Sequence, residues 1–540
     1  MGFSTNGTKE IELINDVGKI WSTTPGTAFS LATFFSPSAP SDFLSDPFVK
    51  WDVGSGRFFA GIFDVSLGGE IMAVSTTSDP SGTWNLYRIR YPSTTVTGGG
   101  CPDQGKAGVD SNVVGLGFNE FAATGVGGCP TTATFRGAAI EVFNKAEMMA
   151  GATVHFVYTD PLSTYFSLVP ADTQGSSTTE FFASLDYGTS TQLHQVTSVG
   201  VPLGGPTDVT LTVLPDLTVK SYSNPPKAPQ SGTTKKIDSG DDRTQNVSMS
   251  GTKLSLAATV GCKPKGDTAK RACGRVYEVD DTSTAAPLLK KSLTISAVGK
   301  YFIYPAATIL GTNTVAVSIG QSSSSTFGSL YTTAGTWGLA LAGPVQVQAG
   351  TAKNTTGRYG DYFAVAVQPG TTNQYWVAGE IGGTSGSTFK WNTAAGVVTV
   401  SQRPHLSRRS RGASLREAPL PGDRLPPFLR LAAASPQPAA TFDQRLRRRR
   451  SATRPAVRRP PPAPKAPATQ PGTLLDEALI AVATSAPPAV RASESRLPAL
   501  RMLSSSPSVP RKLTVSFGPG REPDRRSTAS TRRTARTLSF

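Results

Sequence analysis

The stretch that decides the fold runs from residue 45 to residue 92. It reads SDPFVKWDVGSGRFFAGIFDVS over residues 45–66 and IMAVSTTSDPSGTWNLYRIRYP over residues 71–92. Three runs within it, FFAGIFDV, IMAVSTT and WNLYRIRY, are rich in β-branched and aromatic residues, and turn residues bound each run. This pattern predicts a small antiparallel meander of three strands.

Comparable units follow one another through the first 400 residues. Turn signals recur about every 8–12 residues, and helical periodicity is almost absent apart from one short helical turn that Gly151 ends. The pattern predicts an all-β fold, which could be a sandwich, a barrel or a propeller. Because a four-stranded blade takes roughly 40–50 residues, we expect residues 1–400 to form a β-propeller of about six to eight four-stranded blades.

The charge of the chain is distributed unevenly. The whole chain carries a net charge of +16, and residues 401–540 contain 27 Lys and Arg against 8 Asp and Glu. That leaves 26 basic and 29 acidic residues for residues 1–400, a net charge of −3. Residues 1–400 also contain every Trp, Tyr and Cys, which is typical of a globular domain.

Residues 401–540 have a different composition. They hold half of the prolines, and 25 of their 27 basic residues are Arg, so we predict a disordered, Pro/Ala/Arg-rich tail. The lack of Asn, Tyr and Trp is typical of GC-rich DNA translated in a wrong frame, which is the first hypothesis for the tail. The alternatives are a genuine disordered linker and a basic arm that binds nucleic acid or an anionic surface.

Five segments, in this order, resemble a group of secreted bacterial β-propeller proteins that are described as sialidase-like or BNR-repeat-like. They are DPFVKWDVGSGRFF, SDPSGTWNLYRI, CPDQGKAGVDSNVV, AAIEVFNKAEMMAG and RYGDYFAVAVQP. The resemblance covers roughly residues 5–400 and implies the fold rather than an activity. The segment that contains Ser78, Asp79, Gly82, Thr83 and Trp84 also resembles the Asp-box of sialidase-type propellers, which is a structural turn. It differs from the Asp-box by one residue inserted before the glycine.

The expected location is extracellular or at the cell surface. The sequence contains no apolar run of about 18 residues, so no transmembrane helix is predicted, and no signal-peptide pattern opens the chain. Sequons at Asn6, Asn246 and Asn354 and the cysteines are nevertheless typical of exported proteins. Relative to the family it resembles, the chain is expected to start late, so that one blade lacks its closing strand.

Disulfides are predicted from the positions of the four cysteines. Three pairings are possible, and the nearness of loops favours Cys101 with Cys129 and Cys262 with Cys273. The last two cysteines lie at the facing ends of a predicted hairpin. No Cys-x-x-Cys motif indicates reactive thiols.

The residue pattern predicts no cofactor with a recognisable motif. The three histidines, at positions 155, 194 and 405, have no ligand spacing. The loop with Asp103, Asp110 and Asn112 supplies oxygen atoms that suit calcium, although the loop is not an EF-hand. Calcium therefore stays a weak candidate.

No catalytic residue can be assigned from the sequence. A sialidase would need an arginine triad, and only eight Arg occur in residues 1–400, with no Phe/Tyr-Arg-Ile-Pro start. The carboxylates of Asp110, Glu120, Asp361 and Glu380 show no spacing that would pair them as in a glycosidase. Asp46, Asp52 and Asp79 are interpreted as side chains that bond nearby backbone N–H groups in Asx-turns.

The function that this pattern favours is a binding or scaffold role for a propeller, with a carbohydrate or a protein as the unknown ligand. One alternative is a sialidase-like glycoside hydrolase. The other is a protein that binds nucleic acid or an anionic surface through its basic tail.

Overall fold

The computed structural model describes residues 1–400 with gaps, together with residues 511–514 and 535–538. The gaps are residues 23–25, 27, 38–41, 67, 91–99, 123–133, 160–161, 189–190, 206, 281–285 and 386–387. Within these limits the chain is nearly all β, as predicted, with two short helices, α1 (Leu31–Phe35) and α2 (Lys145–Ala150). The predicted helical turn is α2, which Gly151 ends with a left-handed φ of 67°.

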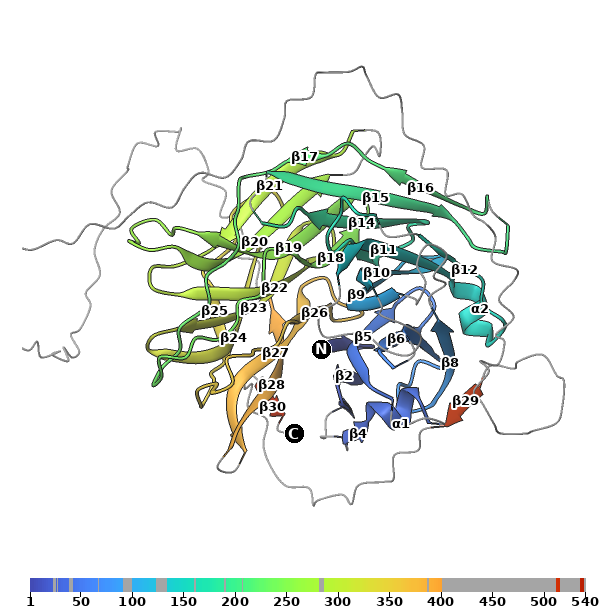
Figure 1. Ribbon diagram of the computed structural model, residues 1–540, viewed down its shortest axis with the longest axis horizontal. Coiled ribbons are helices and arrows are strands. Elements are labelled where there is room, and N and C mark those ends of the chain that lie inside the picture. Colours follow the sequence, from blue (N-terminus) through green and yellow to red (C-terminus); the bar gives the residue numbers. More distant parts are fainter. Residues whose placement is uncertain are drawn as a thin grey trace, which may run out of the picture. The chain divides into compact units, whose positions relative to one another are not determined.

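The strands of residues 1–400 form seven consecutive groups, and neighbours within a group pair in antiparallel fashion (Figure 1). The first group is β1 (Gly2–Thr5), β2 (Glu10–Ile14), β3 (Val17–Trp21) and β4 (Ala28–Ser30). The second is β5 (Leu44–Asp52), β6 (Arg57–Asp64), β7 (Gly69–Ser75) and β8 (Thr83–Arg90). The third is β9 (Gly100–Val109), β10 (Val113–Ala122), β11 (Phe135–Asn144) and β12 (Phe156–Tyr158).

The later groups repeat this plan. The fourth is β13 (Val169–Gln174), β14 (Thr179–Leu185), β15 (Gln192–Gly200), β16 (Val209–Val213) and β17 (Leu217–Thr218). The fifth is β18 (Thr244–Ser250), β19 (Lys253–Cys262), β20 (Arg271–Asp280) and β21 (Leu288–Ile295). The sixth is β22 (Tyr301–Leu310), β23 (Thr314–Ser323), β24 (Thr326–Thr336) and β25 (Val345–Gln348), and the seventh is β26 (Ala364–Val367), β27 (Gln374–Ser385) and β28 (Thr388–Thr399).

Two short strands belong to the region for which the sequence predicts a disordered tail. β29 (Arg511–Thr514) pairs with β8, and β30 (Ala535–Leu538) pairs with β28. The other residues of 401–540 lie outside the described residues, so the predicted disorder stays a prediction.

The first strands of the seven groups neighbour one another in a closed circuit. β1 contacts β5, β5 contacts β9, β13 pairs in parallel with both β9 and β18, β18 contacts β22, and β22 contacts β26. The circuit closes because β26 contacts β1. In Figure 1 the labels β5, β9, β18, β22 and β26 accordingly lie around the N-terminus.

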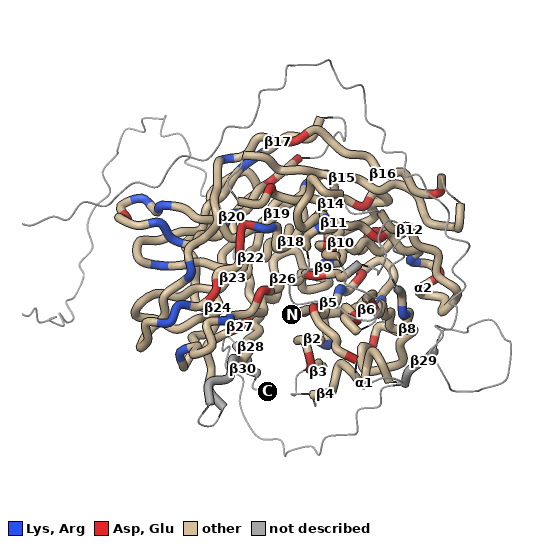
Figure 2. Tube along the Cα trace, in the orientation of Figure 1, with Lys and Arg blue, Asp and Glu red and all other residues tan. Residues whose placement is uncertain are grey.

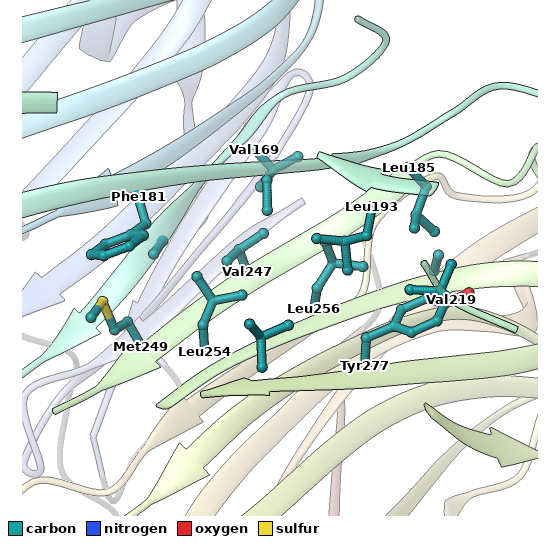
Figure 3. Close-up of a cluster of buried hydrophobic side chains, with 14 of the residues drawn as sticks. Val169, Phe181, Leu185, Leu193, Val219, Val247, Met249, Leu254, Leu256 and Tyr277 are labelled. Atoms are coloured by element: carbon teal, nitrogen blue, oxygen red, sulfur yellow. The ribbon is translucent and has the colours of Figure 1, made fainter. Parts of the chain in front are cut away.

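Hydrophobic cores fill the spaces between neighbouring groups. Figure 3 shows the core between the fourth and fifth groups, where Phe181 and Leu193 face Val247, Leu256 and Tyr277. The strands β7 and β22 are buried at every residue. The reason is that a sheet with neighbours on both sides buries both of its faces.

The predicted disulfide between Cys262 and Cys273 is confirmed, and it joins the facing ends of β19 and β20. Replacing both cysteines by serine is expected to lower the free energy of unfolding by about 3 kcal/mol, because the unfolded chain regains the entropy of the opened loop. Urea unfolding of the full chain measures this loss. The double alanine variant should lose the same amount, and an unchanged unfolding midpoint in both variants would contradict the prediction.

Candidate functional site

The first strands are irregular near the ends at which the chain enters them. All four non-glycine residues with a positive φ in the described chain lie there, namely Asp46, Gln104, Ser167 and Tyr304. Register shifts accompany three of them, in β5 between Ser45 and Phe48, in β9 opposite Gly117 and Asn119 and in β22 between Ile303 and Ala306. A further shift lies in β18 between Thr244 and Asn246. Such bulges redirect side chains, and each strained residue costs about 1–3 kcal/mol, so their repetition marks this end of the circuit as a functional candidate.

Six side chains from two strands and two loops meet at this end, and we call them the central cluster. They are Asp46 on β5, Asp103 and Lys106 on β9, Arg243 directly before β18, and Asp361 and Tyr362 directly before β26. Asp103, Lys106 and Asp361 interact electrostatically with one another, and each of them also interacts with Asp46 and Arg243.

Arg243 is held in place from two sides. Its Nε and Nη2 donate to the two carboxylate oxygens of Asp241 at 2.7 Å each, and its guanidinium lies 4.9 Å from the ring centroid of Phe166. Its remaining nitrogen, Nη1, lies 3.9 Å from Asp103 Oδ2, is buried and has no hydrogen-bond partner among the described residues. The guanidinium group of Arg243 is therefore preorganised, and one of its donors is directed at the central cluster.

Asp46 joins β5 to β9 rather than closing its own turn. Its Oδ2 accepts a hydrogen bond from the backbone N–H of Gln104 at 2.9 Å. The Asx-turn interpretation is therefore wrong for Asp46, because the bulge in β5 turns its side chain towards the neighbouring sheet. The interpretation is confirmed for Asp52 and Asp79, which accept from the backbone N–H groups of Ser55 and Ser81 at 2.9 Å.

Lys106 is the cation at the middle of the cluster. Its Nζ lies 3.1 Å from the ring centroid of Tyr362, a close cation–π contact. Burial lowers the pKa of Lys106 to about 7, against the opposing effects of the Asp46 and Asp361 carboxylates. The amine can therefore change its charge near neutral pH.

The two acids beside Lys106 have raised pKa values. Burial and the nearby carboxylates of Asp46 and Asp361 raise the pKa of Asp103 to about 6, although its side chain remains 47% exposed to solvent. Burial and Asp46 also raise the pKa of Asp361. A carboxyl group that reaches solvent and titrates near neutrality can donate or accept a proton at physiological pH.

The predicted Asp-box turn lies between β7 and β8, within a separate set of contacts. Gly82 donates its N–H to the carbonyl of Asp79 at 3.1 Å, and the indole Nε1 of the fully buried Trp84 donates to the carbonyl of Pro80 at 2.9 Å. Lys9 pairs with Asp79 at 2.7 Å, which ties the turn to the first group of strands. These contacts give the turn a structural role.

The suggested calcium ligands do not surround one point. Asp103 lies near the start of β9 and belongs to the central cluster, whereas Asp110 follows the end of that strand. Asp110 Oδ1 accepts from the backbone N–H groups of Asn112 and Val113 at 2.7 and 2.6 Å. The calcium site stays a prediction.

The four carboxylates for which the sequence shows no glycosidase-like spacing have different surroundings. Asp361 belongs to the central cluster, while Glu120 pairs with Arg136 at 3.4 Å and accepts from the hydroxyl of Tyr158. Glu380 accepts from the backbone N–H of Gly360 at 2.5 Å, and its burial raises its pKa to about 8. The structure therefore brings only Asp361 of this set to the cluster.

The remaining cysteines and histidines lie elsewhere. Cys101, two residues from Asp103, takes part in a disulfide, and its predicted partner Cys129 lies outside the described residues, as does His405. The Nδ1 atom of His155 lies 2.9 Å from Glu147. No group of three or more His, Cys, Asp and Glu residues in the described ranges is arranged to hold a metal ion.

His194 forms two pH-dependent ion pairs in the fourth group of strands. Its Nε2 and Nδ1 atoms lie 2.5 Å from Asp186 and 2.7 Å from Asp216. Burial lowers the pKa of His194, but the two hydrogen-bonded carboxylates outweigh that effect and raise it above 6.5. The two ion pairs therefore contribute their full stability below pH 6.5, and this contribution is lost as the pH rises through the folded-state pKa of His194.

Replacing His194 by glutamine is expected to remove about 1 kcal/mol of stability at pH 6 and less at pH 8. Urea unfolding at the two pH values measures the difference. An equal loss at both pH values in His194→Gln would contradict the proposed charge state.

Sequence reasoning missed most of the central cluster. The sequence pattern suggests Asp103 only as a calcium ligand and Asp361 only as one of several carboxylates, and it singles out neither Lys106 nor Tyr362. The available signals were Asp46-Pro47 and Tyr304-Pro305 near strand starts, where proline is confined to edges and bulges.

No protein family and no curated protein matches this sequence. Among solved structures, the Trypanosoma rangeli sialidase in complex with sialic acid is 11% identical with a TM-score of 0.34, covering 73% of this chain and 59% of the sialidase. A PL25 ulvan lyase is 10% identical with a TM-score of 0.32, covering 70% of this chain and 88% of the lyase. The Synechocystis apocarotenoid oxygenase is 9% identical with a TM-score of 0.29, covering 65% of this chain and 68% of the oxygenase.

At these TM-scores the likenesses support neither a family nor an activity for this chain. None of the helices in the described residues has the length and apolar character needed to cross a membrane.

Proposed function

We propose that this chain is a seven-bladed β-propeller that binds carbohydrate at the central cluster. The seven groups of strands are the blades, and the closed circuit of first strands surrounds the propeller axis. The observation that carries the proposal is the meeting of the six cluster side chains at one end of that circuit.

The chemistry of the cluster suits a sugar. Carboxylates such as those of Asp46 and Asp103 accept hydrogen bonds from hydroxyl groups, and the Arg243 and Lys106 side chains donate to ring and hydroxyl oxygens. Arg243 Nη1, Gln104 Oε1 and Tyr362 Oη are buried without hydrogen-bond partners among the described residues. Buried polar atoms are normally satisfied, so a polyhydroxylated ligand that pairs with them would remove an existing cost.

Backbone strain supports the same conclusion. Asp46, Gln104 and Tyr304 hold left-handed conformations at φ values of 57°, 60° and 51°. Such conformations persist where the surroundings fix them, and they cluster at ligand-binding sites. The bulged strands thus hold the cluster in a fixed geometry before a ligand arrives, which lowers the entropic cost of binding.

The test is a glycan screen of the full chain, followed by calorimetric titration of any glycan that binds. Asp361→Asn is expected to weaken binding about tenfold or more, because it removes a charged hydrogen-bond acceptor from the cluster. The matched control is Asp79→Asn, since the Asp79 side chain is 49% exposed but lies in the turn between β7 and β8. Equal effects of the two substitutions would overturn the proposal.

One observation favours a second function, that of a glycoside hydrolase. The pKa of Asp103 is raised to about 6, which suits a general acid at near-neutral pH. In this alternative Asp103 protonates the oxygen of the leaving sugar. Release of reducing ends that disappears in Asp103→Asn would support it, whereas binding without turnover would leave the chain a binding protein.

We further propose that the protein works in an oxidising compartment, outside the cell or at its surface. The disulfide between Cys262 and Cys273 and the disulfide at Cys101 support this, because such bonds persist where thiols are not kept reduced. Peptide mapping of culture medium and cell lysate tests it, and recovery of the protein only from lysate with reduced cysteines would overturn it.

A further inference from the structure

Three loops at the end of the circuit that holds the central cluster are rich in exposed cations. They are residues 219–243, residues 263–270 and residues 349–363, and together they contain ten Lys and Arg against five Asp and Glu. Residues 1–400 carry a net charge of −3, so the remaining residues of that range have a net charge of −8. Figure 2 shows Lys and Arg concentrated on the part of the chain that carries β20 to β24.

We define the basic loop face as the exposed cations of these three loops. Its members are Lys220, Lys227, Lys235, Lys236, Lys263, Lys265, Lys270, Lys353 and Arg358.

The three loops are fixed against one another. The side chain of Gln230 exchanges two hydrogen bonds with the backbone of Asn354, at 2.6 and 2.7 Å, and Asp238 donates its N–H to the carbonyl of Gly357 at 3.1 Å. Gly261, at the end of β19, donates its N–H to the carbonyl of Ser223 at 2.6 Å. The cations therefore form one surface of fixed shape.

The acids of these loops do not neutralise the face. Asp241 is bound to Arg243, Asp267 is bound to Arg271 at 2.9 Å, and Asp238 pairs with Lys227 alone, at 3.4 Å. The pair of Asp238 and Lys227 is exposed and contributes little, so the cations of the face favour an anionic partner.

The basic loop face continues directly into the central cluster. Arg243 ends the loop of residues 219–243, and Asp361 and Tyr362 lie in the loop of residues 349–363. A chain-like ligand with one sugar at the cluster therefore passes over these loops.

We propose that the ligand is a polyanionic polysaccharide, whose sulfate or carboxylate groups bind the basic loop face while one sugar unit occupies the central cluster. This inference rests on the proposed carbohydrate function and names the class of polymer.

The composition of the face favours a polysaccharide over a nucleic acid. Eight of its nine members are Lys, which act as point charges, and only Arg358 offers a guanidinium fork for phosphate. Single-stranded nucleic acids bind to positive grooves that interleave aromatic residues for base stacking. The aromatic residues of these loops, Tyr222, Tyr359 and Phe363, are buried, and the Tyr362 ring is covered by Lys106.

Lysine acetylation of the full chain, mapped by mass spectrometry, tests the inference. The probes are short dextran sulfate and uncharged dextran of the same length. Dextran sulfate is expected to slow the labelling of Lys236, Lys263 and Lys265 about tenfold, while dextran has no such effect. Residues 401–540 contain two Lys among 27 basic residues, so this readout separates the face from the tail.

Lys253 and Lys290 are the internal controls, because they lie on β19 and β21, away from the three loops. The double variant Lys236→Glu/Lys265→Glu should abolish the protection of Lys263, and Lys253→Glu/Lys290→Glu should not. Equal labelling rates with both probes, or protection of the control lysines to the same extent, would overturn the inference.

Two further outcomes separate the possible causes of a failure. Single-stranded DNA that protects the face better than dextran sulfate would overturn the choice of a polysaccharide. Protection by dextran sulfate that survives Lys106→Met would uphold the basic loop face and count against the central cluster as the sugar site.

Discussion

Replacing Trp84 by alanine is expected to lower the free energy of unfolding by about 3–5 kcal/mol. The indole is fully buried in the core of the first two groups, with ring centroids 5.3 Å from Phe34 and 6.5 Å from Phe58. Its Nε1 donates to the carbonyl of Pro80 at 2.9 Å, so the substitution opens a cavity and leaves that carbonyl without its partner.

Urea unfolding of the full chain measures the loss. Trp84→Phe is the matched comparison, because it keeps most of the ring contacts and removes only the hydrogen bond and part of the volume, and it should cost less. A loss below about 1 kcal/mol in Trp84→Ala would show that the turn does not anchor the second sheet.

Replacing Lys106 by methionine is expected to weaken carbohydrate binding about tenfold to a hundredfold, because a charged donor in the cluster is lost. The same variant should be more stable than the wild type below pH 7. The folded-state pKa of Lys106 is about 7, below the usual lysine value of 10.5, so the unfolded chain binds more protons between these two values. Wild-type stability therefore rises with pH over that range, and Lys106→Met should flatten the rise.

The charge on Lys106 gives a second readout. Binding by the wild type should weaken as the pH rises above 7 and the amine loses its proton, whereas Lys106→Arg keeps its charge and should not weaken above pH 7. If Lys106→Met bound as tightly as the wild type, Lys106 would have no role in the site. A loss of stability at pH 6 would show instead that Lys106 is a structural cation.

The sequence predicts well what depends on neighbouring residues. Turn chemistry predicted the hairpin that Cys262 and Cys273 join, and the glycine at position 151 predicted the end of α2. The Asx-turns at Asp52 and Asp79 are likewise set by residues two or three positions away.

The central cluster could not be predicted in this way, because its members come from distant parts of the chain. Asp46 meets Gln104 across 58 residues, and Lys106 meets Tyr362 from another blade. A bulge also reverses the face on which a side chain lies, so that period-two alternation fails at the strand ends that matter most. The lowered pKa of Lys106 depends on burial that only the closed circuit creates.

The most direct test of the central claim is carboxyl footprinting of the full chain, with carbodiimide labelling of Asp and Glu mapped by mass spectrometry. The probe is short polygalacturonate, and Asp103 and Asp79 form the comparison because their side chains are 47% and 49% exposed. We predict that the probe protects Asp103 about tenfold and leaves Asp79 unchanged, since only Asp103 lies in the central cluster. Equal labelling of Asp103 with and without a bound probe would contradict carbohydrate binding at the central cluster.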